Sequence, residues 1–353
     1  MSASGSTPRR TPGRTGLALG LSAYLMWGGF PLYFPLLAPA GSVEIIAHRV
    51  VWSLVVCAVL LTATRGWGPF VAAVRHRRTL ALLSLGAALI AVNWLVYVYA
   101  VLSDQVVDAS LGYFLNPLVT VLLAVFVLGE RVRPVQWVAL GFGALAVVVI
   151  VIGVARLPWV ALTLATSFGL YGLIKNRVGR TVNALAGLGV ETAVLFPLAL
   201  AYLVWLQATG TGHFTGYGSW HAVALMCAGV LTATPLLLFS GAARRLPLRT
   251  IGMLQYLTPM LQFILGLVVF HEQMPAARWA GFALVWVALV ILTVDGLRTS
   301  RLDLLAQRAA NGARIEDSPA LDRTTGNVPP IDTSTGITTG DGPGPAVGPS
   351  VRR

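Results

Sequence analysis

The sequence predicts an all-α membrane protein of ten transmembrane helices, built as two inverted five-helix repeats and followed by a disordered C-terminal tail. Three observations predict this fold class: the apolar composition, the one-sided placement of cations and an internal repeat. Of the 353 residues, 56% are hydrophobic and 11% are charged, whereas soluble domains are about 45–50% apolar and about 25% charged. This composition excludes an ordinary soluble domain.

The predicted helices are apolar segments of about 20 residues, the length that a helix needs to cross the hydrocarbon core of a bilayer. The first half contains segments near 16–38, 44–64, 79–102, 109–128 and 135–154. The second half contains segments near 158–176, 184–207, 220–242, 250–270 and 277–296. The chain is thus divided into an N-terminal segment 1–15, a first repeat 16–154, a second repeat 155–296 and a tail 297–353.

The tail differs from the rest of the chain in composition. It is rich in Gly, Pro, Thr, Asp and Arg and lacks a long apolar run. Such a segment cannot bury enough apolar surface to offset its ordering entropy, so we expect 297–353 to be disordered. The alternative for residues 299–315 is a short basic helix on the membrane surface.

The placement of the cations predicts the orientation of the chain. Nearly all of the 25 Lys and Arg residues lie before residue 16, in alternate connections or in the tail, whereas the other connections hold only Arg156 and Arg278. Because Lys and Arg collect on the cytoplasmic side, we expect a multi-pass protein of the cytoplasmic (inner) membrane with both termini in the cytoplasm. The net charge of +12 then faces anionic lipid headgroups, and no nucleic-acid partner is expected.

The internal repeat aligns residues 115–137 with residues 257–279. Proline, glutamate and tryptophan recur in register, as Pro117 with Pro259, Glu130 with Glu272 and Trp137 with Trp279. Five helices are an odd number, so the second half enters the membrane from the opposite side. Inverted repeats of this kind are typical of secondary transporters, in which they form the two gates of alternating access.

The two matched prolines predict helix breaks beside a central site. Proline lacks the backbone N–H and disturbs the preceding turn of a helix, and matched interruptions in both halves indicate a binding site in transporters. Pro117 and Pro259 are therefore the candidates for a broken helix. The alternative is a packing kink without a role in binding.

Four ionisable residues inside the predicted helices are candidates for coupling or gating, because a charge in the membrane is costly. Glu191 lies about seven residues into its helix and is the candidate for proton coupling, with a structural or gating carboxyl as the alternative. His48 and Arg49 are candidates for a gate or an anionic-substrate contact, or else have an architectural role. Lys175, the only lysine, is either a cavity cation or a cytoplasmic anchor.

Aromatic and amide side chains form the second set of candidates, because small-molecule sites combine apolar walls with a few polar groups. The predicted substrate cavity comprises Tyr24, Trp27, Asn93, Trp94, Tyr97, Tyr113, Asn116, Tyr171, Gln255 and Tyr256. Asn93 and Tyr97 are four residues apart and share one helix face. The alternative for each aromatic residue is packing in the core or at the membrane interface.

The sequence predicts no catalytic residue, no cofactor and no metal site. The five His residues show no ligand spacing, and both Cys residues lie within apolar segments. The expected partners are a small-molecule substrate and the lipid bilayer, with proton coupling as an option and no oligomeric state specified. A passive channel and an intramembrane enzyme acting on lipid are the alternatives to a transporter.

Eight motifs spread over residues 16–296 are similar to one known family. In order, these are AYLMWGGFPLYF, EIIAHRVVWS, NWLVYVYAV, ASLGYFLNPL, LATSFGLYGLIKN, ETAVLFP, TPLLLFSGAARRL and GMLQYLTPM. They resemble the RarD branch of the EamA family, within the drug/metabolite transporter superfamily. The resemblance implies a ten-helix carrier with two EamA units and a central cavity lined by both. It also associates the branch with chloramphenicol sensitivity or efflux and with relatives that export amino acids, so we expect an exporter of a chloramphenicol-like or amino-acid-like compound.

Overall fold

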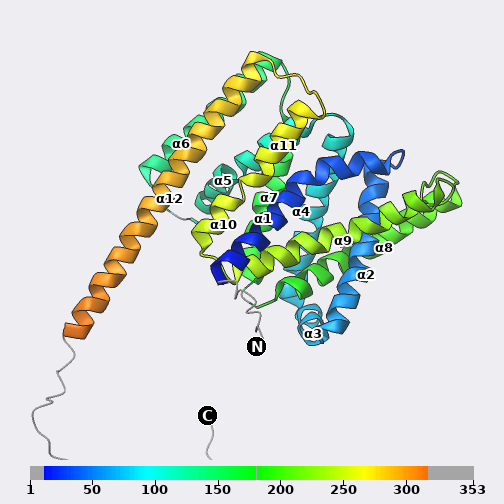
Figure 1. The fold of residues 1–353 in the computed structure, drawn as a ribbon, viewed down its shortest axis with the longest axis horizontal. Helices are drawn as coiled ribbons and strands as arrows, with labels where there is room; N and C mark the ends of the chain where they lie inside the picture. The colour runs from blue at the N-terminus through cyan, green and yellow to red at the C-terminus, as the bar shows by residue number, and fades with distance from the viewer. Residues whose placement is uncertain (1–11, 130, 180, 317–353) are drawn as a thin grey trace, which may run out of the picture. The chain divides into compact units, whose positions relative to one another are not determined.

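The computed structural model describes residues 12–129, 131–179 and 181–316, and all regular secondary structure in these residues is helical (Figure 1). The described residues up to position 300 belong to one compact unit. The first predicted half contains α1 (Pro12–Tyr33), η1 (Phe34–Leu37), α2 (Ser42–Ala63), α3 (Trp67–Arg75), α4 (Arg77–Leu102), α5 (Val106–Leu128) and α6 (Pro134–Val154). The second contains α7 (Trp159–Val178), α8 (Ala184–Ala208), α9 (Gly218–Ala243), α10 (Leu248–Leu254), α11 (Leu257–Val268) and α12 (Ala276–Glu316).

The predicted all-α membrane fold is confirmed. Nine helical segments among the described residues are long and apolar enough to cross a membrane. The tenth predicted segment, 158–176, is α7, a helix of 20 residues with Lys175 and Arg177 in its last turn. This helix packs against α4 and α5, so it faces protein more than lipid and has less need of an apolar surface.

Two short helices add to the predicted elements. The nine-residue α3 lies in the connection between α2 and α4 and packs against α4 and α8, and η1 extends α1 by one turn. At the C-terminal end, α12 continues beyond the predicted boundary at Gly296 as far as Glu316, in line with the alternative of a helix over 299–315. Residues after Gly296 include Leu, Arg, Ala and Gln, which favour helix. The rest of the predicted tail, 317–353, and residues 1–11 lie outside the described residues.

The two matched prolines have different effects on their helices. The helix α5 runs through Pro117 without interruption, whereas the segment predicted over 250–270 is divided into α10 and α11, with the interruption at Gln255 and Tyr256. A proline ring clashes with the carbonyl group four residues earlier, which for Pro259 is that of Gln255. Pro259 itself lies in the first turn of α11, where no intrahelical N–H bond is lost.

The packing of the helices follows a two-fold pattern. The contacts are α1 with α9 and α11, α7 with α4 and α5, α2 with α8 and α9, α4 with α8, and α5 with α11. Exchanging helices of equal rank in the two predicted halves (α1 with α7, α2 with α8, α4 with α9 and α5 with α11) turns the set of contacts into itself: three pairs of contacts are exchanged, and α2 with α8 and α5 with α11 stay the same. The interior of the bundle therefore lies between the two predicted halves.

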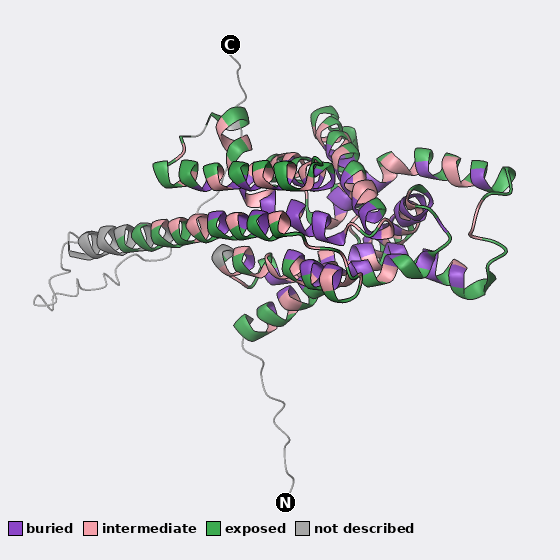
Figure 2. Ribbon diagram, turned by 90° about the horizontal axis from the view of Figure 1, so that it is seen from above, coloured by how far each residue is buried: buried purple, intermediate pink, exposed green. Residues whose placement is uncertain are grey.

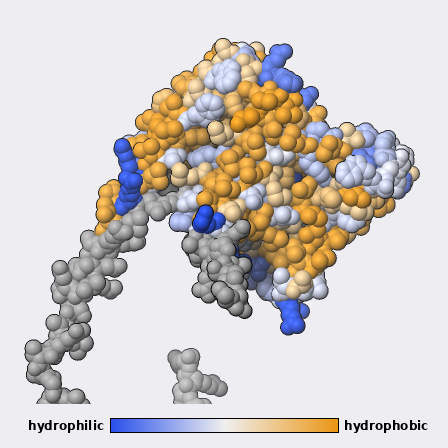
Figure 3. All heavy atoms as spheres, in the orientation of Figure 1, coloured by the Kyte–Doolittle hydropathy of each residue, from blue (hydrophilic) through white to orange (hydrophobic). Residues whose placement is uncertain are grey.

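The side chains sort into a buried interior and an apolar exterior. Buried residues lie where helices face one another, and exposed residues lie on the outward faces (Figure 2). Large apolar residues such as Phe126, Ile152 and Leu198 are each about three-quarters exposed, and hydrophobic residues form much of the face shown in Figure 3. A soluble monomer rarely exposes an apolar surface of this extent, so this surface is the one that contacts lipid.

Candidate functional site

The interior of the bundle contains a set of linked polar side chains, which we call the central polar cluster. Its members come from six helices of both predicted halves: Arg49 on α2, Asn93 and Tyr97 on α4, Tyr113 on α5, Ser167 on α7, Thr232 on α9 and Gln262 on α11. Polar side chains surrounded by apolar helices are found where a membrane protein binds or moves polar solutes.

Asn93 joins three helices in this cluster. Its Nδ2 donates to Ser167 Oγ and to the carbonyl oxygen of Leu164, both at 3.1 Å, and its Oδ1 accepts from the Tyr113 hydroxyl at 3.3 Å. The side chain is only 1% exposed, and both ends of its amide have partners. Asn93 therefore ties α4 to α5 and α7.

Tyr97 extends the cluster into α11. Gln262 Nε2 donates to the Tyr97 hydroxyl at 2.8 Å and to the carbonyl oxygen of Trp27 at 3.3 Å, while Gln262 Oε1 is buried and has no partner among the described residues. The rings of Tyr97 and Tyr113 meet edge to face, with centroids 5.7 Å apart. Gln262 was absent from the predicted set, although it is a lone amide in the apolar segment of α11, and interhelical bonds are a usual role for such amides.

Arg49 is a buried cation at the edge of the cluster. It is 5% exposed, and its Nε donates to Thr232 Oγ1 at 2.7 Å. The guanidinium carbon lies 4.2 Å from the centroid of the Trp94 ring and 5.5 Å from that of Phe30. Its Nη1 is buried and has no hydrogen-bond partner in the described part of the chain.

A second cluster joins α7 and α8 around Glu191. Lys175 Nζ lies 3.0 Å from Glu191 Oε1 in an ion pair, and the Tyr171 hydroxyl donates to Glu191 Oε2 at 3.1 Å. The Glu191 side chain is 3% exposed and that of Lys175 is 32% exposed. Three of the predicted candidates thus meet at one carboxylate, a pairing that the sequence analysis did not anticipate.

The other predicted residues have simpler surroundings. His48 stacks on Phe214 with ring centroids 4.9 Å apart, and both of its ring nitrogens lack a partner among the described residues. Tyr24 and Trp27 form an aromatic group with Phe239 of α9. Outside the central polar cluster, Tyr256 packs in the core between α5, α6 and α12, Gln255 is exposed, and the Oδ1 of Asn116 is buried without a described partner.

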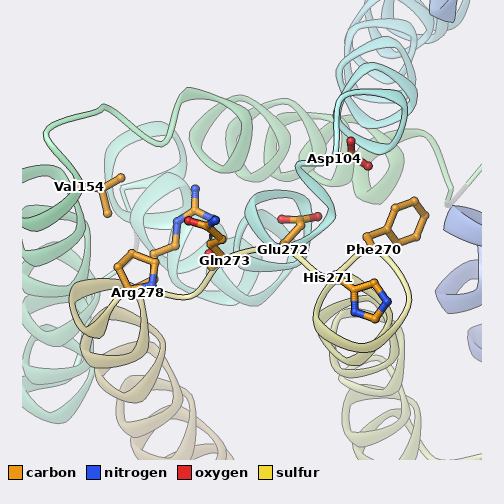
Figure 4. Close-up of a pocket in the computed structure, with 8 residues that line it drawn as sticks. Asp104, Val154, Phe270, His271, Glu272, Gln273 and Arg278 are labelled. Carbon is orange, nitrogen blue, oxygen red and sulfur yellow. Dashed lines mark hydrogen bonds between the residues drawn. The ribbon is translucent and has the colours of Figure 1, made fainter.

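For orientation we name the two ends of the bundle after the predicted topology. The outer end comprises the connections 38–41, 103–105, 155–158, 209–217 and 269–275, and the inner end comprises 64–76, 129–133, 179–183 and 244–247. The outer end contains a surface pocket of about 390 Å³, lined by Asp104, Val154, Phe270, His271, Glu272, Gln273, Pro275 and Arg278 (Figure 4).

Glu272 lies in this pocket and caps α5. Its carboxylate accepts hydrogen bonds from the N–H groups of Val106 and Val107, which begin that helix and have no intrahelical acceptor. Burial raises the pKa of Glu272 to about 7, and the two backbone hydrogen bonds act in the opposite direction. The sequence analysis noted Glu272 only as the repeat partner of Glu130 and gave it no role.

A histidine–carboxylate contact and an ion pair also link the predicted halves at the outer end. His213 Nδ1 lies 2.6 Å from Glu44 Oε2, and Arg278 Nη2 lies 3.4 Å from Asp108 Oδ2. At the inner end, the pair of Arg133 with Asp295 spans 2.9 Å and also joins the two predicted halves. Polar contacts between the halves are therefore present at both ends of the bundle.

The comparisons with known proteins agree with this architecture. Residues 14–152, which nearly coincide with the first predicted repeat, match the EamA-like transporter family. The chain is 53% identical to Protein RarD of Streptomyces exfoliatus over 288 residues, which cover 82% of this chain and 91% of that protein. It is 38% identical to Protein RarD of Escherichia coli (82% and 97% covered). It is 32% identical to the chloramphenicol-sensitive protein RarD of Pseudomonas aeruginosa (81% and 96% covered).

One solved crystal structure shares the fold, with a TM-score of 0.52 at 19% sequence identity, over 80% of this chain and 98% of that one. A helical bundle with an apolar exterior and a polar cluster in its interior, together with these relatives, defines a class: the multi-pass membrane transporters of the bacterial inner membrane. Within that class, the chain belongs to the RarD branch of the EamA family, in the drug/metabolite transporter superfamily.

Proposed function

We propose that this transporter is a secondary-active exporter that moves a small amphipathic molecule across the membrane by alternating access. The observation that carries the proposal is the central polar cluster, in which hydrogen bonds join helices of both predicted halves. The two bodies that move are the predicted repeats 16–154 and 155–296. A site shared by two such bodies is exposed to opposite sides of the membrane when they rock against each other.

The state of the two ends supports a conformation with the site occluded. Cross-half contacts are present at the outer end and at the inner end. The cavity beside Arg49 has a volume of about 10 Å³, which suffices for about one water molecule. Alternating access then consists of breaking one set of end contacts while the other set stays closed.

The walls of the cluster favour an amphipathic substrate. Trp94, Tyr97 and Tyr113 present aromatic surface next to hydroxyl and amide groups, the combination that small-molecule sites use. The P. aeruginosa relative is named for chloramphenicol sensitivity, and we propose chloramphenicol-like and amino-acid-like compounds as the first substrates to test.

The hydroxyl of Tyr97 provides a test of the site. In everted vesicles with labelled chloramphenicol and a panel of amino acids, we expect saturable uptake that Tyr97→Phe slows about five- to tenfold. This factor corresponds to the roughly 1 kcal/mol of one hydrogen bond, here the bond from Gln262. The matched control is Tyr99→Phe, because the Tyr99 ring is 41% exposed and has no bond in the cluster. Equal uptake by both variants, or steady single-channel conductance in planar bilayers, would contradict the proposal.

Glu191 is the residue that we propose for proton coupling. Protonation of its carboxylate would release the Lys175 ammonium, 3.0 Å away, and so loosen the contact between α7 and α8. In proteoliposomes we expect Glu191→Gln to keep substrate counterflow and to lose accumulation driven by a proton gradient. Asp104→Asn, at an exposed carboxyl of the outer pocket, is the matched control. Full proton-driven accumulation by Glu191→Gln would end the coupling hypothesis.

A further inference from the structure

Arg49 is a buried cation whose charge no carboxylate compensates within the described residues. The ion pairs there join Arg133 with Asp295, Lys175 with Glu191, His213 with Glu44 and Arg278 with Asp108. The buried acids of the bundle are thereby engaged with other partners. A buried charge without a counter-charge is strongly unfavourable, so the position of Arg49 calls for an explanation.

The hydrogen bonds of Arg49 leave the side of its guanidinium group that carries the two Nη atoms without a partner among the described residues. A guanidinium group carries five N–H donors in one plane, and the described residues engage only the Nε–H, through Thr232. Trp94 and Phe30 lie against the guanidinium group, and cation–π contacts of this kind involve its flat face and none of its N–H donors. The buried Nη1 belongs to the two-pronged edge that binds a carboxylate through two parallel hydrogen bonds.

The space beside Arg49 has the chemistry of an anion site with an apolar extension. The small cavity is lined by the rings of Phe30, Tyr33 and Phe34 and by Thr232. No acidic residue is among its lining residues, so no carboxylate there would pair with the ammonium of an amino acid. Arg49 is the only cation of the lining, which suits a single negative charge.

We infer that Arg49 binds the carboxylate of the transported molecule and that the substrate class is an amphipathic monocarboxylate without an amino group. The carboxylate lies in the plane of the guanidinium edge, and the apolar part of the substrate contacts the aromatic rings of α1 and η1. This inference deepens the proposed function and rests on it, because it names the substrate class of the same central site. The inference thus narrows the substrates named under the proposed function: we expect neutral amides, such as chloramphenicol-like compounds, and zwitterionic amino acids to bind more weakly than a monocarboxylate.

The test is a thermal-shift measurement on the purified full chain in detergent. The probes are the monocarboxylates benzoate, 4-methylpentanoate and 3-phenylpropionate, together with 3-phenylpropionamide and L-phenylalanine. We expect at least one carboxylate to raise the unfolding midpoint of the wild type, and the neutral amide and the amino acid to raise it less at the same concentration. If none of the carboxylates raises the midpoint, or if the amide raises it equally, the inference is overturned.

Variants of Arg49 separate a binding role from a structural one. Arg49→Gln should weaken carboxylate binding at least tenfold, and Arg49→Lys should give an intermediate loss, because an ammonium group keeps the charge but lacks the two-pronged edge. Without ligand, Arg49→Gln should unfold at a midpoint no lower than the wild type, since it removes an uncompensated charge. Arg75→Gln, at an exposed position on α3, is the matched control and should bind like the wild type. A lower midpoint of Arg49→Gln without ligand, together with unchanged carboxylate affinity, would assign Arg49 a structural role.

Counterflow in proteoliposomes distinguishes this inference from the proposed function. Carboxylate binding that depends on Arg49, without counterflow of any compound, would refute transport and leave the binding site in place. Counterflow of neutral compounds that is insensitive to Arg49→Gln would support transport and overturn the assignment of the substrate class.

Discussion

At the scale of single residues, Glu272 shows how burial and hydrogen bonding oppose each other. The carboxylate comes from the connection between α11 and α12 and binds the first N–H groups of α5, where the helix dipole favours negative charge. Burial nevertheless outweighs these bonds, because the pKa is raised from 4.5 to about 7. Burial thus favours the protonated form of Glu272 more than the two hydrogen bonds favour its charged form. The contact therefore responds to pH near neutrality.

We expect the stability of the protein to fall as this carboxyl loses its proton. Because the pKa is higher in the folded protein, the contribution of Glu272 is complete below pH 4.5 and is lost as the pH rises through about 7. The unfolding midpoint in detergent should drop by about 2–5 °C between pH 5 and pH 8. Glu272→Gln should flatten this slope, whereas Asp104→Asn, in the same pocket, should keep it. A full slope in Glu272→Gln would contradict this explanation.

Members of the central polar cluster could be grouped from the sequence only where they lie on the same helix. Asn93 and Tyr97 share a face of α4, and both reach the central polar cluster. The partners of these side chains come from α5, α7 and α11, and no local pattern specifies which helix packs opposite. For the same reason the sequence indicated Glu191 and Lys175 separately and did not indicate their ion pair.

At the scale of helices, the crossing of α2 and α9 depends on a glycine. A Cβ atom on Gly229 would lie 2.3 Å from the carbonyl carbon of Trp52, so the two backbones are in direct contact. Small residues allow this close approach in membrane bundles, where packing drives helix association.

Gly229→Ala should therefore separate α2 from α9 and destabilise the bundle. Overpacking costs about 1–3 kcal/mol, which we expect to lower the unfolding midpoint by several degrees and to broaden the elution peak in size-exclusion chromatography. Gly141→Ala on α6 is the control, because nothing lies within 4 Å of its Cβ position. An unchanged midpoint in Gly229→Ala would show that the crossing is not tight.

The helices themselves were predictable because apolar runs of about 20 residues have few alternatives in a bilayer. The short additional helix and the helix interruption were less predictable. The short helix α3 is too brief to span and carries no strong signal, and Pro117 and Pro259 match in the sequence but differ in position within their helices. Pro259 lies in the first turn of α11, directly after the interruption, whereas α5 runs through Pro117, and the sequence match does not reveal this difference.

At the scale of the whole molecule, the orientation in the membrane is the main prediction still to be tested. Cations are concentrated in the N-terminal segment, in alternate connections and in the tail, and cations of this kind are retained in the cytoplasm. The two-fold pattern of helix contacts fits two halves of opposite orientation.

Fusion reporters measure this orientation directly. We expect alkaline phosphatase fused to the C-terminus to be inactive and a fluorescent protein at the same position to fluoresce. Phosphatase inserted at Gly216, in the connection 209–217, should be active. An active C-terminal phosphatase fusion would reverse the predicted topology.

The all-α membrane fold was predictable from the composition and the spacing of the apolar segments, because both act over the full length of the chain. The division into inverted repeats and the orientation stay predictions. The polar contacts at the two ends could not be predicted, since they join residues such as Glu44 and His213 that are far apart in the sequence. The conformation of the loops determines which of these residues meet. Loop sequences lack the periodic pattern of apolar residues from which helices are predicted.

The contacts at the outer end consist of carboxylates, an imidazole, a guanidinium group and backbone N–H groups. Water can hydrate every one of these groups once they separate, whereas parting a seal of Leu and Phe side chains would require wetting apolar surface at about 25 cal/mol per Å². Water can therefore replace each of the polar contacts at the outer end, and we expect dissolved ions to compete for these contacts. Under the proposed mechanism and the predicted topology, the composition of the external medium would then help to set how often the outer end opens.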